Sequence, residues 1–180
     1  MSLGHGLYAV LILALAYFIR GISGFGSGLV AVPLLALAFP LQRVVPFILL
    51  LDFTASVLLG GLNLKQVRWD EVKPLIPFGM MGVALGTTLL VHLPKTPLLI
   101  GLGLFVLVFA VRSLLNLHGD EPVSRWWALP ASLIGGTVGA LFGTGGPPYV
   151  IYLAHRLRGK GQLRATLSGV FFLEGLVRIA

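Results

Sequence analysis

The long apolar stretches of this chain restrict its fold more than any other feature of the sequence. They cover residues 3–19, 44–62, 75–91, 98–111, 126–142 and 167–176. Several approach the ~20 residues that a helix needs to cross ~30 Å of hydrocarbon. Charged residues make up only 11% of the chain, whereas a soluble domain carries about 25%. Since the stretches also lack the polar outer faces of soluble helices, we predict an all-α polytopic membrane protein in the cell membrane.

Composition argues against several other classes of protein. The chain has no cysteine, which excludes a disulfide framework and a thiolate metal site. Its four histidines are scattered, and no Ser, His and Asp residues form a recognisable nucleophile arrangement, so we expect no metal, no cofactor and no enzymatic activity. The net charge of +7 comes from short loops between apolar stretches, which is typical of membrane orientation rather than of nucleic-acid binding. The expected partner is the lipid bilayer, with no nucleic acid.

A short glycine motif occurs twice and indicates an internal duplication. Residues 25–28 read Phe-Gly-Ser-Gly, and residues 142–145 read Phe-Gly-Thr-Gly. Each copy follows a long apolar stretch and precedes a shorter one. A further apolar stretch with one acid then comes after each copy, with Asp52 in the first case and Glu174 in the second. Four matched residues alone are weak evidence for a duplication, and the matched acids strengthen that evidence.

The duplication predicts the organisation of the chain. A first transmembrane repeat covers residues 1–117, a polar linker covers 118–125, and a second repeat covers 126–180. The second repeat has no counterparts of the stretches at 72–93 and 96–117. We therefore expect the second repeat to be incomplete in this chain, because membrane proteins built from two repeats usually have matching halves.

The distribution of basic residues predicts how the repeats are oriented. If each glycine motif lay in an ordinary crossing, the loop charges would divide almost evenly between the two sides. If each motif is instead a turning point, Arg43 and Lys95 share the side of the N-terminus. The opposite side then holds Lys65, Arg68, Lys73, Arg125, Arg156, Arg158, Lys160 and Arg164. By the positive-inside rule, the second arrangement places the N-terminus outside and makes the two repeats inverted, each with a broken or re-entrant glycine-rich helix.

The two glycine motifs are also the candidate binding site. Irregular backbone at membrane depth is tolerated only where protein or water surrounds it. Helices that begin at Gly28 and Gly146 would point amide donors and a positive dipole at the membrane centre, and this arrangement suits a small anion. The candidate substrate-binding residues are Arg20, Gly24, Phe25, Gly26, Ser27, Gly28, Phe142, Gly143, Thr144, Gly145, Gly146 and Pro147. Close helix packing is the alternative role, which we favour for the glycines spaced four apart, Gly82, Gly86, Gly135 and Gly139; Gly143 continues the same spacing.

Three charged residues within apolar stretches have alternative roles. Arg20, if buried, either meets an anion or pairs with Asp52; at an interface it would extend to water. Asp52 is the candidate ion-coupling residue, because a buried acid can carry a proton. Asp52 could equally hold Arg20 as a structural partner. For Glu174, a local ion pair with Arg178 one helical turn later is the favoured role.

The glycine pattern resembles that of a known family. The first element has the form GxxGFGxGxxxxP, at Gly21, Gly24, Phe25, Gly26, Gly28 and Pro33. The second element is glycine- and proline-rich, at Gly139, Gly143, Gly145, Gly146, Pro147 and Pro148. Over its whole length the chain is similar to the TauE/SafE family of sulfite-exporter-like permeases. The resemblance implies a secondary transporter that moves small sulfur-containing anions, such as sulfite or organosulfonates, across the cytoplasmic membrane by alternating access. The alternatives are an anion channel, a carboxylate permease of the same architecture and a membrane scaffold that transports nothing.

Overall fold

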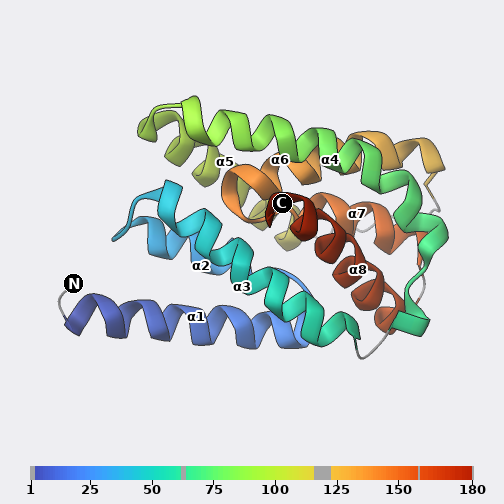
Figure 1. The fold of residues 1–180 in the computed structure, drawn as a ribbon, viewed down its shortest axis with the longest axis horizontal. Helices are drawn as coiled ribbons and strands as arrows, with labels where there is room; N and C mark the ends of the chain where they lie inside the picture. The colour runs from blue at the N-terminus through green and yellow to red at the C-terminus, as the bar shows by residue number, and fades with distance from the viewer. Residues whose placement is uncertain (1–2, 62–63, 116–122, 158, 180) are drawn as a thin grey trace.

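The structure is a computed structural model that describes residues 3–61, 64–115, 123–157 and 159–179. Its regular elements in these ranges are helices (Figure 1). They are α1 (Leu3–Ser23), α2 (Ser27–Ala36), α3 (Leu41–Gly61), η1 (Leu64–Gln66), α4 (Trp69–His92), α5 (Lys95–Leu114), η2 (Arg125–Trp127), α6 (Ala128–Phe142), α7 (Gly146–Arg156) and α8 (Lys160–Ile179). Of the described helices, α1, α3, α4 and α5 are long and apolar enough to cross a membrane. This confirms the prediction of an all-α polytopic membrane protein.

Several helices begin earlier than the apolar stretches that predicted them. Helix α3 starts at Leu41 and α8 at Lys160, whereas the corresponding apolar stretches start at residues 44 and 167. Polar and charged residues occupy the first turns of these helices, and a hydropathy pattern does not count them. The first turn of α4 carries Asp70 and Glu71, and negative charge there interacts favourably with the helix dipole.

Two helical hairpins turn at the two glycine motifs. In the first, the hydroxyl of Tyr8 in α1 donates a hydrogen bond of 2.7 Å to the carbonyl of Leu34 in α2, so α2 runs back along α1. In the second, Arg156 at the end of α7 donates to the carbonyl of Val123, before α6, over 3.4 Å, so α7 runs back along α6. The hairpins enter the bundle from opposite ends (Figure 1). With 10 and 11 residues, α2 and α7 are too short to cross a bilayer.

The turns of both hairpins depend on glycine. Gly24, Gly26 and Gly143 have φ angles of +85°, +94° and +63°. Side chains with a Cβ rarely adopt this left-handed conformation, because Cβ then approaches the following carbonyl. The glycine motifs are therefore the points at which the backbone reverses. The predicted linker at 118–125 falls largely on residues 116–122, which lie outside the described residues.

Helices α4 and α6 pack at very short range through glycines. A Cβ added to Gly82 would lie 2.8 Å from the amide nitrogen of Thr137, and one added to Gly136 would overlap the carbonyl of Gly79. Gly86 likewise meets α6 backbone, and Gly135 meets the ring of Tyr149. The packing role predicted for Gly82, Gly86 and Gly135 is confirmed, and backbones that approach this closely form a tightly fitted pair.

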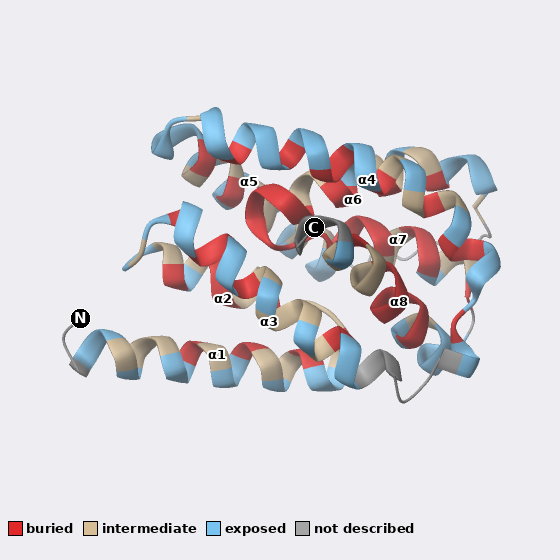
Figure 2. Cartoon of the chain, in the orientation of Figure 1, coloured by how far each residue is buried: buried red, intermediate tan, exposed pale blue. Residues whose placement is uncertain are grey.

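The buried apolar residues form two clusters, and Figure 2 shows that most of the buried backbone lies inside the bundle. One joins α2, the start of α3 and the start of α5, and includes the buried side chains of Val32, Leu41 and Leu98. The other joins the start of α4, α7 and the first half of α8, with Leu75, Leu153 and Leu167 fully buried. By contrast, α1 exposes a row of large apolar side chains, as expected for a surface that contacts lipid: Leu7, Leu11, Leu15, Phe18 and Ile22.

Candidate functional site

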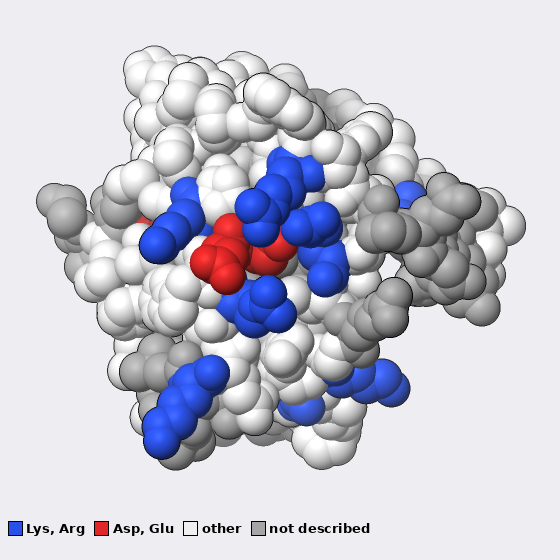
Figure 3. Space-filling view, turned by 90° about the vertical axis from the view of Figure 1, so that its right-hand side faces the viewer, with Lys and Arg blue, Asp and Glu red and all other residues white. Residues whose placement is uncertain are grey.

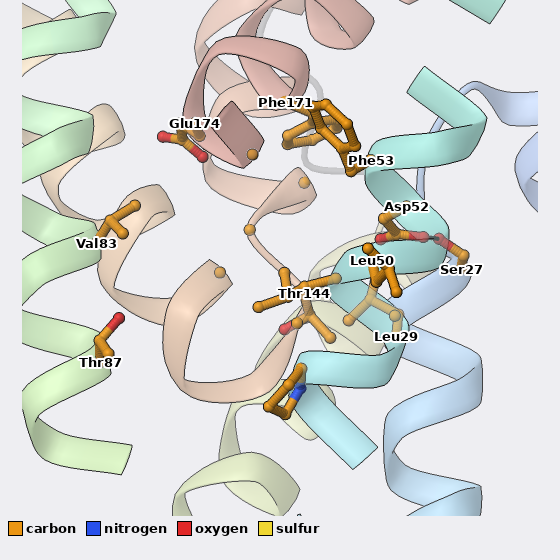
Figure 4. Close-up of a pocket in the computed structure, with 18 of the residues that line it drawn as sticks. Ser27, Leu29, Leu50, Asp52, Phe53, Val83, Thr87, Thr144, Phe171 and Glu174 are labelled. Carbon is orange, nitrogen blue, oxygen red and sulfur yellow. Dashed lines mark hydrogen bonds between the residues drawn. The ribbon is translucent and has the colours of Figure 1, made fainter. Parts of the chain in front are cut away.

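A cavity of about 730 Å³ lies between the two apolar clusters. Helices α1, α2, α3, α4, α6, α7 and α8 contribute to its wall. Figure 4 shows Ser27 and Asp52 on one side of the cavity, with Glu174, Val83 and Thr87 across from them and Thr144 between. Polar groups from both hairpins therefore face one space.

The two glycine motifs contact each other in the wall of this cavity. Gly28 lies against the carbonyl of Gly143, so closely that a Cβ on Gly28 would overlap that oxygen. Gly146 lies against the ring of Phe25, where an added Cβ would be 3.2 Å from a ring carbon. The sequence predicted that these motifs would meet, and they do.

Nine of the twelve candidate binding residues line the cavity: Arg20, Gly26, Ser27, Gly28, Gly143, Thr144, Gly145, Gly146 and Pro147. The other three have packing contacts instead. Gly24 lies beneath the side chain of Arg164, and the ring of Phe25 supports Gly146. Phe142 belongs to an apolar cluster and packs near Phe105, with ring centroids 6.3 Å apart. These three residues shape the turns and do not line the cavity.

Both short helices point their N-termini at the cavity. Helix α2 begins at Ser27 and α7 at Gly146, and neither start has a side-chain cap. The first amides of a helix have no acceptor within the helix, and the dipole makes this end positive. In α7, Pro147 and Pro148 remove two of these donors at no cost to the helix. The amides of Ser27 and Gly28 are thus the larger set of backbone donors at the site.

A buried ion pair lies beside the start of α2. Arg20 is 3% exposed, and its Nη1 lies 2.8 Å from Oδ1 of Asp52. Nη1 also donates to Ser27 Oγ over 3.0 Å, and Nη2 donates to Ser56 Oγ over 2.8 Å. Asp52 Oδ1 accepts further hydrogen bonds from Ser27 at 2.8 Å and from Tyr17 at 2.6 Å. Of the roles left open for Arg20 and Asp52, the structure therefore shows the pairing.

Sequence reasoning missed Tyr17 and Ser56, the outer members of this network. A spacing signal was present, since Tyr17 lies three residues before Arg20 and Ser56 lies four residues after Asp52. Residues at these separations share one face of a helix. Tyr17 with Arg20, and Asp52 with Ser56, thus form a polar face on each of two apolar helices. Two such faces would have indicated that the helices contact each other there.

The paired charges leave specific donors for a ligand. Arg20 and Asp52 together are neutral, so the full charge of Arg20 is not available to a bound anion. Within the described residues, however, Arg20 Nε and Thr144 Oγ1 are buried and have no hydrogen-bond partner. Buried polar groups in proteins are nearly always satisfied. An acceptor in the cavity would satisfy both.

Glu174 is a second acid in the cavity wall. It is 2% exposed, and its Oε1 accepts a hydrogen bond from the hydroxyl of Tyr149. Gly79 permits this approach, because a Cβ there would lie 2.6 Å from Oε1. The side chain of Arg178, the predicted partner, lies outside the described residues. In the structure, Glu174 lines the cavity and accepts a hydrogen bond from Tyr149. The spacing of Glu174 and Arg178 in the sequence indicated neither of these.

The described residues contain no group of three or more His, Cys, Asp or Glu side chains that could hold a metal ion. The acids of the cavity, Asp52 and Glu174, belong to separate hydrogen-bond networks. The site therefore offers amides, hydroxyls and one guanidinium, which are groups that donate hydrogen bonds to oxyanions.

Comparisons with known proteins agree with this architecture. The family model of the sulfite exporter TauE/SafE matches residues 9–180. A protein of Comamonas testosteroni, named as the probable inner membrane transporter protein TsaS, is 33% identical over 136 residues. That alignment covers 74% of this chain but 56% of the relative, so the chain spans little more than half of the relative's length. No solved structure matches the chain. With nearly the whole sequence matched by the family model, the chain belongs to the sulfite exporter TauE/SafE family.

Proposed function

We propose that this protein is a secondary transporter, not an enzyme, which moves small sulfur-containing anions across the cytoplasmic membrane by alternating access. Family membership and the cavity between two hairpins support the proposal. The observation that carries it is the contact of Gly28 with Gly143, which brings two broken helices together beside a buried arginine. Sites between discontinuous helices at membrane depth are a common plan among secondary transporters.

The donors of the cavity suit an oxyanion. An S–O⁻ group near the start of α2 would accept hydrogen bonds from the amides of Ser27 and Gly28. Thr144 Oγ1 and Arg20 Nε, which are buried without partners in the described residues, supply further donors. The helix dipole adds attraction for negative charge, and burial strengthens each of these interactions.

The remaining lining of the cavity favours organosulfonates over sulfite. Leu29, Leu50, Phe53, Val83 and Phe171 form apolar wall around the polar group of residues. Ligand sites typically combine an apolar wall with a few polar groups that orient the ligand. A sulfonate presents an oxyanion to the polar groups and an organic body to the apolar wall. Sulfite would leave most of the cavity of about 730 Å³ to water.

Asp52 is the proposed coupling residue. While it is ionised, it neutralises Arg20 at 2.8 Å. A proton on Asp52 would end that neutralisation and leave the charge of Arg20 to attract the anion. Proton binding and anion binding would then favour each other, as linkage requires. The expected transport is that of an anion together with a proton.

Proteoliposomes test the proposal. The protein should take up benzenesulfonate and methanesulfonate with saturable kinetics, and unlabelled substrate on the far side should accelerate uptake by counterflow. Sulfite should enter more slowly at equal concentration, and acetate should compete weakly. Unitary currents in a planar bilayer would identify an anion channel, and preference for acetate would identify a carboxylate permease. No flux of any of these anions would contradict the transport proposal.

A further inference from the structure

The cavity stops short of one end of the bundle. Helix α4 lines it from Met80 to Thr88, and α8 lines it from Phe171 to Gly175. Both helices begin at the opposite end, where Lys and Arg side chains surround a group of acidic side chains (Figure 3). This end, the basic face, carries Lys65, Arg68, Lys73, Arg125, Arg156, Lys160 and Arg164, with Asp70 and Glu71. Between the basic face and the cavity lies the apolar cluster around Leu75, Leu153 and Leu167.

The carboxylate of Glu71, in the basic face, contacts side chains of the second hairpin. Its side chain is 4% exposed, and its Oε1 lies 2.7 Å from Nη2 of Arg156. Arg156 Nε donates to the same oxygen over 3.1 Å, and the hydroxyl of Tyr152 donates to Oε2 over 2.8 Å. Arg125 approaches to 3.9 Å from a mostly exposed position. The hydrogen bond to Glu71 raises the pKa of the Arg156 guanidinium, which therefore stays charged.

The partners of Glu71 lie on a short helix that follows a glycine turn. Tyr152 and Arg156 belong to α7, a helix of 11 residues that follows the glycine turn at Gly143. The glycine contacts of α4 with α6 leave no space between those two helices. Helix α7 also contacts α6, through Tyr149 against Gly135, so a movement of α7 would have to release that contact as well. A rotation of α7 about its glycine turn would separate it from the start of α4 and would open the apolar cluster. Glu71 would then be exposed to water, which offsets the loss of its partners.

We propose that Glu71, Tyr152 and Arg156 form a latch that holds the basic side of the cavity closed in one state of the transport cycle. This proposal rests on the alternating access proposed above. In the closed state the carboxylate is buried and satisfied by three hydrogen bonds. In the other state α7 moves away, and the cavity opens toward the basic face. The latch therefore sets the balance between the two states.

A single-cysteine reporter tests the latch, because the chain has no cysteine of its own. Val83→Cys places a thiol in the cavity wall, and a membrane-impermeant maleimide is applied from the side of the basic face. In the Glu71→Gln background the labelling rate should rise by about tenfold, since loss of a buried charge partner shifts such equilibria strongly. Asp70→Asn is the matched control, because Asp70 is the exposed neighbouring acid, and it should leave the rate unchanged.

Further variants separate the latch from a loss of folding. Tyr152→Phe should give a smaller increase than Glu71→Gln, and the exchange Glu71→Arg with Arg156→Glu should restore slow labelling. If Glu71→Gln does not elute as a monodisperse species, the double variant Glu71→Cys with Tyr152→Cys, in a protein with no other cysteine, supplies the test. The oxidised cysteine pair should block anion flux, and reduction should restore it. Equal labelling of folded Glu71→Gln and Asp70→Asn, or flux that persists in the oxidised pair, would overturn the proposal. Labelling needs no substrate, so a protein that labels as expected but transports no anion would contradict the transport proposal and leave the latch standing.

Discussion

At the scale of single residues, the pairing of Arg20 with Asp52 is the main finding. Arg20 is almost fully buried at a depth where a lone charge is costly. Its guanidinium is held by Asp52, Ser27 and Ser56. All the side-chain donors around Asp52 converge on one carboxylate oxygen, Oδ1. Because one oxygen accepts all of these hydrogen bonds, the charge of Asp52 can be removed while an acceptor for the hydrogen bonds is kept.

Asp52→Asn should uncouple transport from the pH gradient. The amide oxygen can keep the hydrogen bonds that Oδ1 accepts, so the fold should survive, but the side chain can no longer gain or lose a proton. A gradient of one pH unit corresponds to about 1.4 kcal/mol and to about tenfold accumulation through one coupled proton. Accumulation of benzenesulfonate in proteoliposomes should fall from that value to about one, while equilibrium exchange continues.

Asp70→Asn is the control for this experiment, because Asp70 is exposed and lies outside the cavity lining. It should retain full accumulation. Undiminished accumulation in Asp52→Asn would remove Asp52 from the coupling mechanism and leave it as the structural partner of Arg20.

At the scale of elements, two hairpins with glycine turns build the site. Each hairpin alone would leave backbone donors exposed at membrane depth, which hydrocarbon does not tolerate. The contact of Gly28 with Gly143 covers one turn with the other. Helices α2 and α7 can therefore start inside the bundle, with their N-termini at the cavity wall.

Gly28→Ala should separate the hairpins. The added Cβ would overlap the Gly143 carbonyl, which is backbone and cannot rotate away as a side chain can. We expect a loss of about 1–3 kcal/mol in stability, as for other overpacked cores. A scan of thermal unfolding in detergent measures it, and anion binding should weaken in parallel.

Gly103→Ala is the matched substitution, because a Cβ at Gly103 in α5 has open space around it. Alanine there should be neutral or slightly stabilising, since alanine favours helix more than glycine does. Equal melting temperatures for the two variants would mean that the hairpins do not pack as described.

At the scale of the whole molecule, charge is distributed unequally between the two ends. The basic face holds most of the Lys and Arg residues at or near the helix ends (Figure 3), whereas Arg43 and Lys95 lie at the other end. The positive-inside rule predicts that the basic face is cytoplasmic and that the N-terminus lies outside.

Thiol labelling in intact cells tests this orientation. Gln66→Cys in the basic face should resist an impermeant maleimide until the cells are permeabilised. Thr96→Cys, at the start of α5, should be labelled directly. The reverse pattern would invert the orientation, and labelling of both sites in intact cells would contradict the arrangement of the two ends.

Much of this fold could be predicted from the sequence. Hydropathy located the long helices, because a segment that crosses hydrocarbon must be apolar along its length. The duplicated glycine motif and the charge pattern predicted turning points at Gly24–Gly28 and Gly143–Gly146, where the structure has its turns. That the two hairpins arose by duplication stays a prediction, as does the binding role of the residues around them.

The sequence by itself determined that the chain lies in a membrane and where its backbone must break, since both follow from local composition and from the conformational freedom of glycine. Only the tertiary structure decided the partners of the charged residues: Arg20 with Asp52, Glu71 with Arg156, and Glu174 with Tyr149. Glu71 and Arg156 are 85 residues apart in the chain, and no local pattern relates them. Such pairs form because a charge buried between helices must find a partner on whichever helix packs against it.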